Sequence, residues 1–166
     1  MTDVYIGLGS NLSNPLRQVQ QGLDALSRLP HTILKTRSNI YTTRPIGLLE
    51  QPDFFNAVCQ LETSLSPEAL LDALLTIERK QLRIRGPEKN GPRTLDLDIL
   101  IYGKHQILTQ RLEIPHPRLT ERAFVVVPLM EIAPKLVLND NLKLADVAKS
   151  GQIVKQGIVM HLYAES

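Results

Sequence analysis

Two carboxylates and a group of cations stand close together near the middle of the chain. Asp96 and Asp98 belong to a segment that reads GPRTLDLDILIY, and from Leu95 onward its composition is that of a β-strand. Side chains on a strand repeat every two residues, so both carboxylates point to one face, roughly 6 to 7 Å apart. Two anions this close repel each other and resist burial. The pair therefore indicates a functional site, and a solvated strand face is the alternative.

The loop before this strand carries the cations. It reads RIRGPEKNGPR over residues 83–93, with two Gly-Pro pairs, and its basic side chains are Arg83, Arg85, Lys89 and Arg93. A hard cation such as Mg²⁺ takes one or two protein carboxylates and fills its other positions with water and phosphate oxygens. Arginines grip phosphoryl oxygens through two parallel hydrogen bonds. The two segments together predict a site where metal ions and phosphates meet, under a loop whose Gly-Pro pairs suit a hinged lid.

Other phosphate-binding devices are missing from the sequence. The stretch GLGSNL, from Gly7 to Leu12, begins like a dinucleotide fingerprint but lacks its third glycine, and we interpret it as a tightly packed turn that ends a strand. The chain contains neither a P-loop pattern nor the kinase motifs. Metal ions and arginines must therefore hold the phosphates of any bound nucleotide.

A histidine and two aromatic residues extend the candidate site. His116 lies between two prolines in IPHPRL, with Arg111, Arg118 and Arg122 nearby, so a neutral imidazole there would donate to a phosphate without adding charge. Phe54 and Asn56 share one face of a predicted strand and offer a ring to stack on and an amide to bind a flat heterocycle. Phe124 would supply a second ring. The alternatives are a structural histidine, a polar sheet margin and a core phenylalanine.

The elements that must position these residues follow from hydrophobic periodicity. Strands are predicted over residues 3–9, 33–43, 53–63 and 95–102, with helices from Pro15 toward Pro30 and from Ser66 to about Leu82. This order, β-α-β-β-α-β, predicts an α+β ferredoxin-like sandwich with an antiparallel sheet. We expect Leu95, Leu97, Ile99 and Ile101 to face its helices. A short helix within residues 114–134, a small helix near 144–149 and a strand near 153–162 would form a C-terminal extension of one domain, residues 1–166.

Composition limits the other functions. The chain has 166 residues, 43% hydrophobic and 22% charged, as expected for a globular protein, and a net charge of +2 is too small to indicate nucleic-acid or membrane binding. Cys59 is the sole cysteine, so no internal disulfide forms, and its neighbours on the strand favour a buried position. No apolar run reaches about 18 residues and no signal sequence is evident. We expect a cytoplasmic monomer whose partners are small molecules.

Six segments resemble one family, the 6-hydroxymethyl-7,8-dihydropterin pyrophosphokinases of the folate pathway. They read YIGLGSNL, YTTRPIG, QPDFFNAV, IERKQLRIR, GPRTLDLDIL and IPHPRLTERAFVVVPLMEIAP, in that order, between about Tyr5 and Pro134. The resemblance implies a ferredoxin-like fold and transfer of the β,γ-diphosphoryl group of ATP to the hydroxymethyl oxygen of the pterin. Three positions depart from the family pattern and bear on loop closure and nucleotide affinity: Arg44, Asn90 and Glu113.

The resemblance also implies a role for each matching residue. Asp96 and Asp98 would bind two Mg²⁺ ions, and catalytic roles fall to Arg83, Arg93 and Asp98, with Asp98 or a group beside it accepting the alcohol proton. ATP contacts are implied at Glu78, Arg85, Ile99, Arg111, His116 and Arg122. The pterin pocket is implied at Thr43, Pro45, Ile46, Phe54, Asn56 and Phe124. A ferredoxin-like nucleic-acid-binding module is the main alternative, although no aromatic RNA-binding motif is present.

Overall fold

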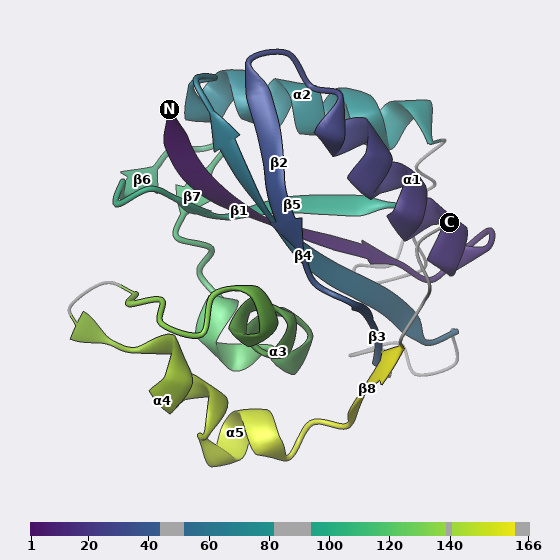
Figure 1. The fold of residues 1–166 in the computed structure, drawn as a ribbon. Helices are drawn as coiled ribbons and strands as arrows, with labels where there is room; N and C mark the ends of the chain where they lie inside the picture. Colours follow the sequence, from purple (N-terminus) through teal and green to yellow (C-terminus); the bar gives the residue numbers. More distant parts are fainter. Residues whose placement is uncertain (44–51, 82–93, 139–140, 162–166) are drawn as a thin grey trace.

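The computed structural model of the chain describes all residues except 44–51, 82–93, 139–140 and 162–166 (Figure 1). The strands that build its main sheet are β1 (Thr2–Ser10), β2 (Thr32–Arg37), β3 (Ile40–Thr43), β4 (Phe54–Thr63), β5 (Asp96–Tyr102) and β8 (Ile158–His161). Two short strands, β6 (Ile107–Leu108) and β7 (Glu113–Ile114), form a separate hairpin. The helices are α1 (Pro15–Ser27), α2 (Pro67–Lys80), α3 (Ala123–Ile132), α4 (Leu144–Ala148) and α5 (Gly151–Val154), and a 3₁₀ turn, η1 (Leu119–Glu121), precedes α3.

The fold combines helices with one main sheet, and the described strand pairs of that sheet are antiparallel, as predicted. Its order is β5-β1-β4-β3-β8, and β2 also pairs with β4. The single strand predicted over residues 33–43 is two strands, because Ser38 interrupts it. Ser38 is buried, its hydroxyl accepts the Val58 N–H at 2.9 Å, and it donates to the Asn39 carbonyl at 2.7 Å. A side chain thus takes the place of a ladder bond at the kink.

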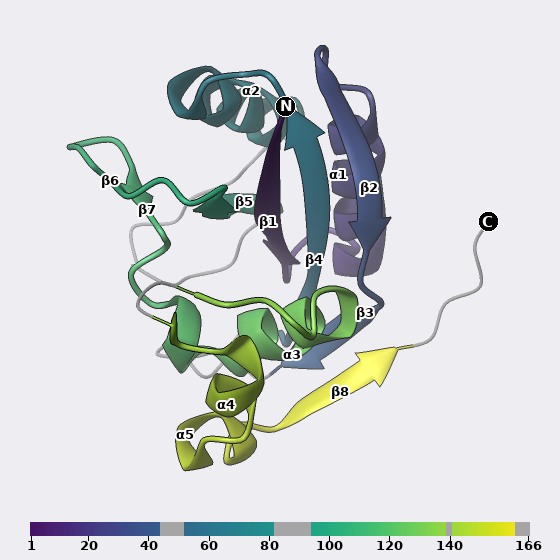
Figure 2. The same cartoon turned by 60° about the vertical axis from the view of Figure 1, so that its left-hand side comes forward.

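Helices cover both faces of the sheet. Side chains of α1 and α2 join one buried cluster with those of β1 and β4, whereas α3, α4 and α5 join a second cluster on the other face. In Figures 1 and 2 the latter three helices gather together, away from α1 and α2. Both helices of the first group begin at a polar cap followed by proline: Asn14 accepts the Arg17 N–H, and Ser66 accepts the Ala69 N–H.

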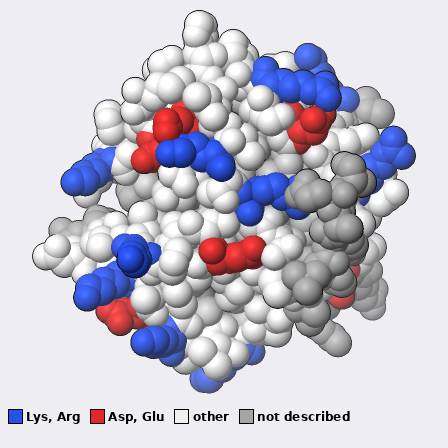
Figure 3. Space-filling model, in the orientation of Figure 1, with Lys and Arg blue, Asp and Glu red and all other residues white. Residues whose placement is uncertain are grey.

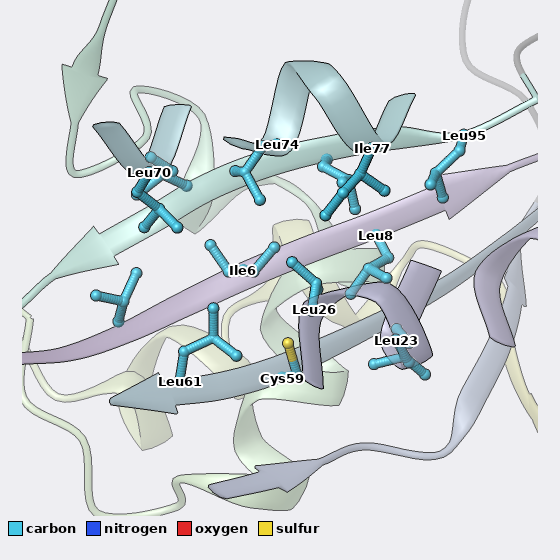
Figure 4. Close-up of a cluster of buried hydrophobic side chains, with 14 of the residues drawn as sticks. Ile6, Leu8, Leu23, Leu26, Cys59, Leu61, Leu70, Leu74, Ile77 and Leu95 are labelled. Carbon is cyan, nitrogen blue, oxygen red and sulfur yellow. The ribbon is translucent and has the colours of Figure 1, made fainter. Parts of the chain in front are cut away.

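The first cluster is the larger core. Figure 4 shows Ile6 and Leu8 of β1 between the leucines of α1 and those of α2, with Cys59 of β4 packed among them. Cys59 is fully buried, and burial raises the pKa of its thiol to about 12. The prediction that this cysteine is a small buried hydrophobe is confirmed, and its thiol stays protonated at neutral pH.

The predicted faces of the strand that bears the two aspartates are correct only up to Leu100. Tyr5 lies opposite Ile101 and Ile6 lies opposite Ile99, so Leu100 is the extra residue of a β-bulge. Beyond the bulge the faces exchange. Ile101 packs with Leu100 on the α3 side, contrary to expectation, and Tyr102 turns to the α1 and α2 side, where its hydroxyl donates to the Leu65 carbonyl.

The C-terminal part also differs in one place from the prediction. The small helix α4 lies where expected, but residues 151–154 form α5 rather than strand, because the Ser150 hydroxyl caps a helical turn by accepting the Ile153 N–H. The final strand begins only at Ile158 and pairs with β3. Among the described residues, no helix combines the length and apolarity that crossing a membrane requires.

Candidate active site

The floor of the candidate site is a row of residues that runs across four strands. Asp96 of β5 lies opposite Gly9 of β1, Gly9 lies opposite Asn56 of β4, and Asn56 lies opposite Tyr41 of β3. Directly opposed residues on antiparallel strands point to the same face. Adjacent strands are about 4.8 Å apart, so the carboxylate of Asp96 and the amide of Asn56 rise from the sheet about 10 Å apart.

A second row lies beside the first and repeats its pattern. Asp98 lies opposite Gly7, and Gly7 lies opposite the buried Val58. Neither glycine places a side chain of its own between the carboxylates and β4, and at Gly7 the space beside the backbone is in contact with the Leu100 side chain. At Gly9 the absence of a side chain is obligatory, since an added Cβ would lie 2.9 Å from the Asn56 amide nitrogen. Asn56 is itself fixed, because its amide oxygen accepts the Thr43 hydroxyl at 3.1 Å.

A pocket opens above this floor, walled by the segment that leads into α3. The residues that line it come from β1, β3, β4, β5, the His116 turn and the start of α3: Gly7, Leu8, Gly9, Thr43, Phe54, Asn56, Ala57, Asp96, Asp98, Leu100, His116, Arg118, Arg122, Phe124 and Val125. The backbone N–H of His116 donates to the Leu100 carbonyl at 2.9 Å, which ties the turn to β5 two residues from Asp98. The pocket is therefore acidic on its floor and basic on its wall.

His116 presents a hydrogen-bond donor to this pocket. Its Nδ1 accepts the backbone N–H of Arg118 at 3.2 Å, so in the neutral ring the proton resides on Nε2. Burial lowers the pKa of His116, the charges of Arg122 and Arg118 lower it further, and Asp96 opposes them. At neutral pH the imidazole is therefore uncharged, and Nε2 carries its proton.

This lowered pKa makes stability depend on pH. Because folded His116 binds a proton less readily than unfolded histidine, whose pKa is about 6.5, stability is present above that value and is lost as pH falls below it. We expect urea unfolding in EDTA to show a smaller loss of stability between pH 7 and pH 5 in His116→Gln than in wild type. His105→Gln, at an exposed histidine, is the control. Identical pH dependence in wild type and His116→Gln would contradict the inference.

Arg122 is the most deeply placed cation of the wall. Its guanidinium carbon lies 5.4 Å from the centre of the Phe124 ring, and its Nε is buried with no hydrogen-bond partner in the part of the chain that the structure describes. Burial lowers its pKa, the charge of Arg118 adds to this, and Asp98 and Asp96 oppose both. An arginine stays charged nonetheless, so the wall holds a cation whose nearest offsetting charges are the floor carboxylates.

The start of α3 is held by a residue from the C-terminal extension. Helix α3 has no side-chain cap of its own, and the Ala123 N–H instead donates to Gln156 Oε1 at 2.9 Å. The amide nitrogen of Gln156 donates to the Glu121 carbonyl at 2.8 Å. These bonds flank Arg122 on both sides, which fixes the backbone from which Arg122 and Phe124 project.

Most of the described residues predicted for the site are brought together in the pocket. The carboxylates, the histidine, the wall arginine and the ring-and-amide group all line it: Asp96, Asp98, His116, Arg122, Thr43, Phe54, Asn56 and Phe124. The aromatic residues are half-buried, so Phe124 is a wall residue rather than a core one. The predictions for Arg83, Arg85, Arg93, Pro45 and Ile46 lie outside the described residues, as do those for Arg44 and Asn90.

Three predicted ATP contacts lie elsewhere among the described residues. Glu78 of α2 is buried and accepts the Leu97 N–H at 2.7 Å, Ile99 packs in the core beneath α1 and α2, and Arg111 binds two acids of α2. The Arg111 guanidinium lies 3.0 Å from Glu68 and 2.5 Å from Asp72. None of the three lines the pocket, so their assignment stays a prediction that rests on the resemblance.

Sequence reasoning gave no role to several residues of the pocket, three of which bear on its shape or charge. Gly7 and Gly9 were predicted to end the first strand in a tight turn, but β1 continues to Ser10 and both glycines belong to the pocket floor. Their spacing of two on a predicted strand was the signal that they share a face. Arg118 was noted as a neighbour of His116 but given no role, whereas its side chain lines the pocket beside that histidine.

The antiparallel sheet carries a pocket that combines two carboxylates, two arginines, a histidine and two phenylalanines. Comparison with known families gives the class of protein. The model of the 7,8-dihydro-6-hydroxymethylpterin-pyrophosphokinase (HPPK) family matches residues 5–134. The chain belongs to this family, and the resemblance seen in the sequence is confirmed.

Individual proteins with similar sequences support the same family membership. The chain is 48% identical over 149 residues to 2-amino-4-hydroxy-6-hydroxymethyldihydropteridine pyrophosphokinase of Haemophilus influenzae, covering 90% of this chain and 92% of that protein. It is 47% identical to the Pseudomonas aeruginosa protein of the same name, covering 87% and 88%. A crystal structure of Plasmodium falciparum HPPK-DHPS superposes with a TM-score of 0.67 at 13% identity, over 89% of this chain but only 43% of that longer one. At that identity the match supports the fold alone.

Proposed function

We propose that the pocket is the active site in which the chain carries out the reaction of its family. The chain is a pyrophosphokinase, an ATP-dependent diphosphotransferase of folate biosynthesis. The diphosphoryl group of ATP passes to the hydroxymethyl group of 6-hydroxymethyl-7,8-dihydropterin, which gives AMP and the pterin diphosphate. One observation carries the assignment of the site: the row Asp96–Gly9–Asn56 sets a carboxylate for the phosphate end beside an amide for the heterocycle, with Gly9 as the residue between them on the sheet.

We assign the two halves of the pocket to the two substrates. The pterin lies over Asn56, with its ring between Phe54 and Phe124, and Thr43 holds the amide in place. ATP directs its phosphates toward His116, Arg122 and the floor carboxylates. Arg118, which the sequence left without a role, adds a second arginine to the phosphate side. The resemblance adds Glu78, Arg85, Ile99 and Arg111 for ATP, and Pro45 and Ile46 for the pterin.

The donor set of the pocket fits magnesium ions that arrive with ATP. Asp96 and Asp98 are two hard oxygen donors on one strand face, and Mg²⁺ is typically bound by one or two carboxylates together with substrate phosphates. In the described residues no group of three His, Cys, Asp or Glu side chains stands ready to hold an ion without substrate. We infer two Mg²⁺ ions, held by Asp96 and Asp98. When bound, they offset the charge of the triphosphate.

The residues of the chain position the two substrates and offset the negative charge of the transferring phosphoryl group. In the transfer, the hydroxymethyl oxygen forms a bond to the β-phosphorus, the bond from that phosphorus to the α–β bridging oxygen breaks, and AMP leaves. Asp98, or a metal-bound group beside it, accepts the alcohol proton, since Asp96 and Asp98 are the carboxylates among the described lining residues. Arg122 and the Nε2–H of His116 stabilise charge on the phosphoryl oxygens. We assign the same role to Arg83 and Arg93 by resemblance.

The nucleic-acid-binding alternative is not favoured. On the face shown in Figure 3, basic and acidic side chains are interspersed rather than gathered into one basic surface. The arginines of the pocket wall face carboxylates, which would repel a phosphate backbone unless metal ions intervened.

We also propose the finer points of architecture. The order β5-β1-β4 followed by β2 and β3, with α1 and α2 on one face, supports a ferredoxin-like sandwich to which α4, α5 and β8 add a C-terminal extension. We infer a single domain, residues 1–166, that acts as a monomer, since the described lining of the pocket needs no second copy. The single buried cysteine supports a cytoplasmic location. A dimer in sedimentation would contradict the monomer.

A coupled assay tests the function. Wild-type protein incubated with ATP, Mg²⁺ and 6-hydroxymethyl-7,8-dihydropterin is expected to form AMP in equal amount to the pterin diphosphate, and chelation with EDTA is expected to abolish both. Omission of the pterin controls for ATP hydrolysis. AMP formation that continues unchanged in EDTA would refute the metal assignment, and phosphate or ADP in place of AMP would refute the reaction.

A further inference from the structure

One exposed carboxylate links α3, which forms the wall of the pocket, to β3 at the edge of its floor. Glu131 lies in the last turn of α3, the helix whose first turn carries Phe124. Its Oε1 accepts the Tyr41 hydroxyl at 2.6 Å, and its two oxygens accept the Asn39 N–H at 3.0 and 3.1 Å. The Asn39 side-chain amide donates to Oε2 at 2.9 Å. An exposed glutamate on a helix end seldom has this many partners from another element.

Both partners belong to β3 or to the kink that precedes it. Tyr41 is the fourth member of the floor row, directly beside Asn56 on β3, and Asn39 stands at the kink where β3 begins. Burial of the Tyr41 phenol, together with its bond to Glu131, raises the pKa of that hydroxyl. Tyr41 therefore remains a donor at any physiological pH, and the contact with Glu131 is a permanent charge-assisted hydrogen bond.

The geometry points to Glu131 as a positioning residue for the pterin: we propose that its bonds to Asn39 and Tyr41 set the separation between the Phe124 wall and the Asn56 floor. Gln156 holds the backbone at the other end of the helix, and the buried face of α3 packs on the sheet between them, so Glu131 fixes the end of α3 that lies next to β3. The role rests on the proposed function, because the pterin is assigned to this half of the pocket. The phosphate side depends on β5, the His116 turn and Arg122. Gln156 holds the backbone beside Arg122 at the opposite end of α3, and Glu131 makes no described contact with any of the three.

A comparison of Michaelis constants tests this role. We expect Glu131→Ala to raise the KM for the pterin about tenfold, as for the loss of hydrogen bonds to a charged group, with the KM for ATP and kcat each within about twofold of wild type. Glu131→Gln keeps an acceptor for Tyr41 and is expected to recover most of the loss. Titration of pterin fluorescence should give the same ratio without turnover. Glu62→Ala, which removes a carboxylate paired with Lys35 at 2.9 Å outside the pocket, is the control.

A purely structural role predicts a different result. If Glu131→Ala lowers stability and changes kcat and both KM values together, or leaves the pterin KM unchanged, the proposal is overturned. Should Glu131→Ala not fold, Tyr41→Phe decides, since it removes only the phenol oxygen and is expected to raise the same KM by a smaller factor. Failure of wild type to form AMP would overturn the proposed function and this role with it, whereas an active wild type with an unaltered Glu131→Ala overturns the role alone.

Discussion

Asp96→Asn is expected to lower kcat by about 10³-fold at standard Mg²⁺, a loss of about 4 kcal/mol in transition-state stabilisation. The asparagine keeps the shape of the side chain and its place opposite Gly9 but removes the charge that holds a cation against the triphosphate. Because affinity for the cation falls, part of the activity should return as the Mg²⁺ concentration is raised. Asp98→Asn should lose at least as much and respond less to Mg²⁺, since it also lacks the proton acceptor.

The measurement is AMP formation at saturating ATP and pterin across a range of MgCl₂ concentrations. Asp24→Asn is the matched control: Asp24 is an exposed carboxylate on α1, paired with Arg28 at 2.5 Å, and its loss should leave the Mg²⁺ dependence unchanged. Thermal unfolding of each variant separates catalysis from folding. Turnover of Asp96→Asn within tenfold of wild type at low Mg²⁺ would remove Asp96 from the metal site.

The residues of the floor could be predicted because strand periodicity decides their face. Asp96 with Asp98, and Phe54 with Asn56, are pairs at a spacing of two, and the structure places all four in one pocket. The helix starts at Pro15 and Pro67 were equally accessible, since each follows a capping side chain that acts over three residues. Strand-face spacing and helix caps involve residues at most three positions apart, so the sequence alone is enough to predict them.

Features that join distant segments could not be predicted in the same way. The bulge at Leu100 follows from how β5 pairs with β1, and pairing register is a property of two strands together. Glu131 and Tyr41 are 90 residues apart, and Gln156 reaches the start of α3 from 33 residues away. Nothing in the sequence around Glu131 distinguishes it from an ordinary glutamate at a helix end. The tertiary structure alone gives it four hydrogen bonds.

Arg122→Met is expected to reduce kcat/KM by about 10³-fold while leaving the protein no less stable than wild type. The activity loss follows from removing the deepest cation of the wall, since arginines that stabilise transferring phosphoryl groups are worth about 10³ to 10⁵ in rate. The stability is expected to hold because the folded protein no longer buries a charge whose Nε has no hydrogen-bond partner among the described residues. Methionine can still pack on Phe124, which replaces the stacking of the guanidinium.

Arg122→Lys separates charge from geometry. Lysine restores the positive charge without the planar fork, so an intermediate rate is expected if bidentate contact with phosphoryl oxygens matters. Arg28→Met, which removes an exposed arginine at the C-cap of α1, is the control and should change neither rate nor melting temperature appreciably. Opposite movements of activity and stability in Arg122→Met would mark Arg122 as a side chain kept for binding at a cost to the fold. If Arg122→Met instead retains activity within tenfold of wild type, the phosphates do not lie against this wall, and the assignment of the two halves of the pocket is wrong.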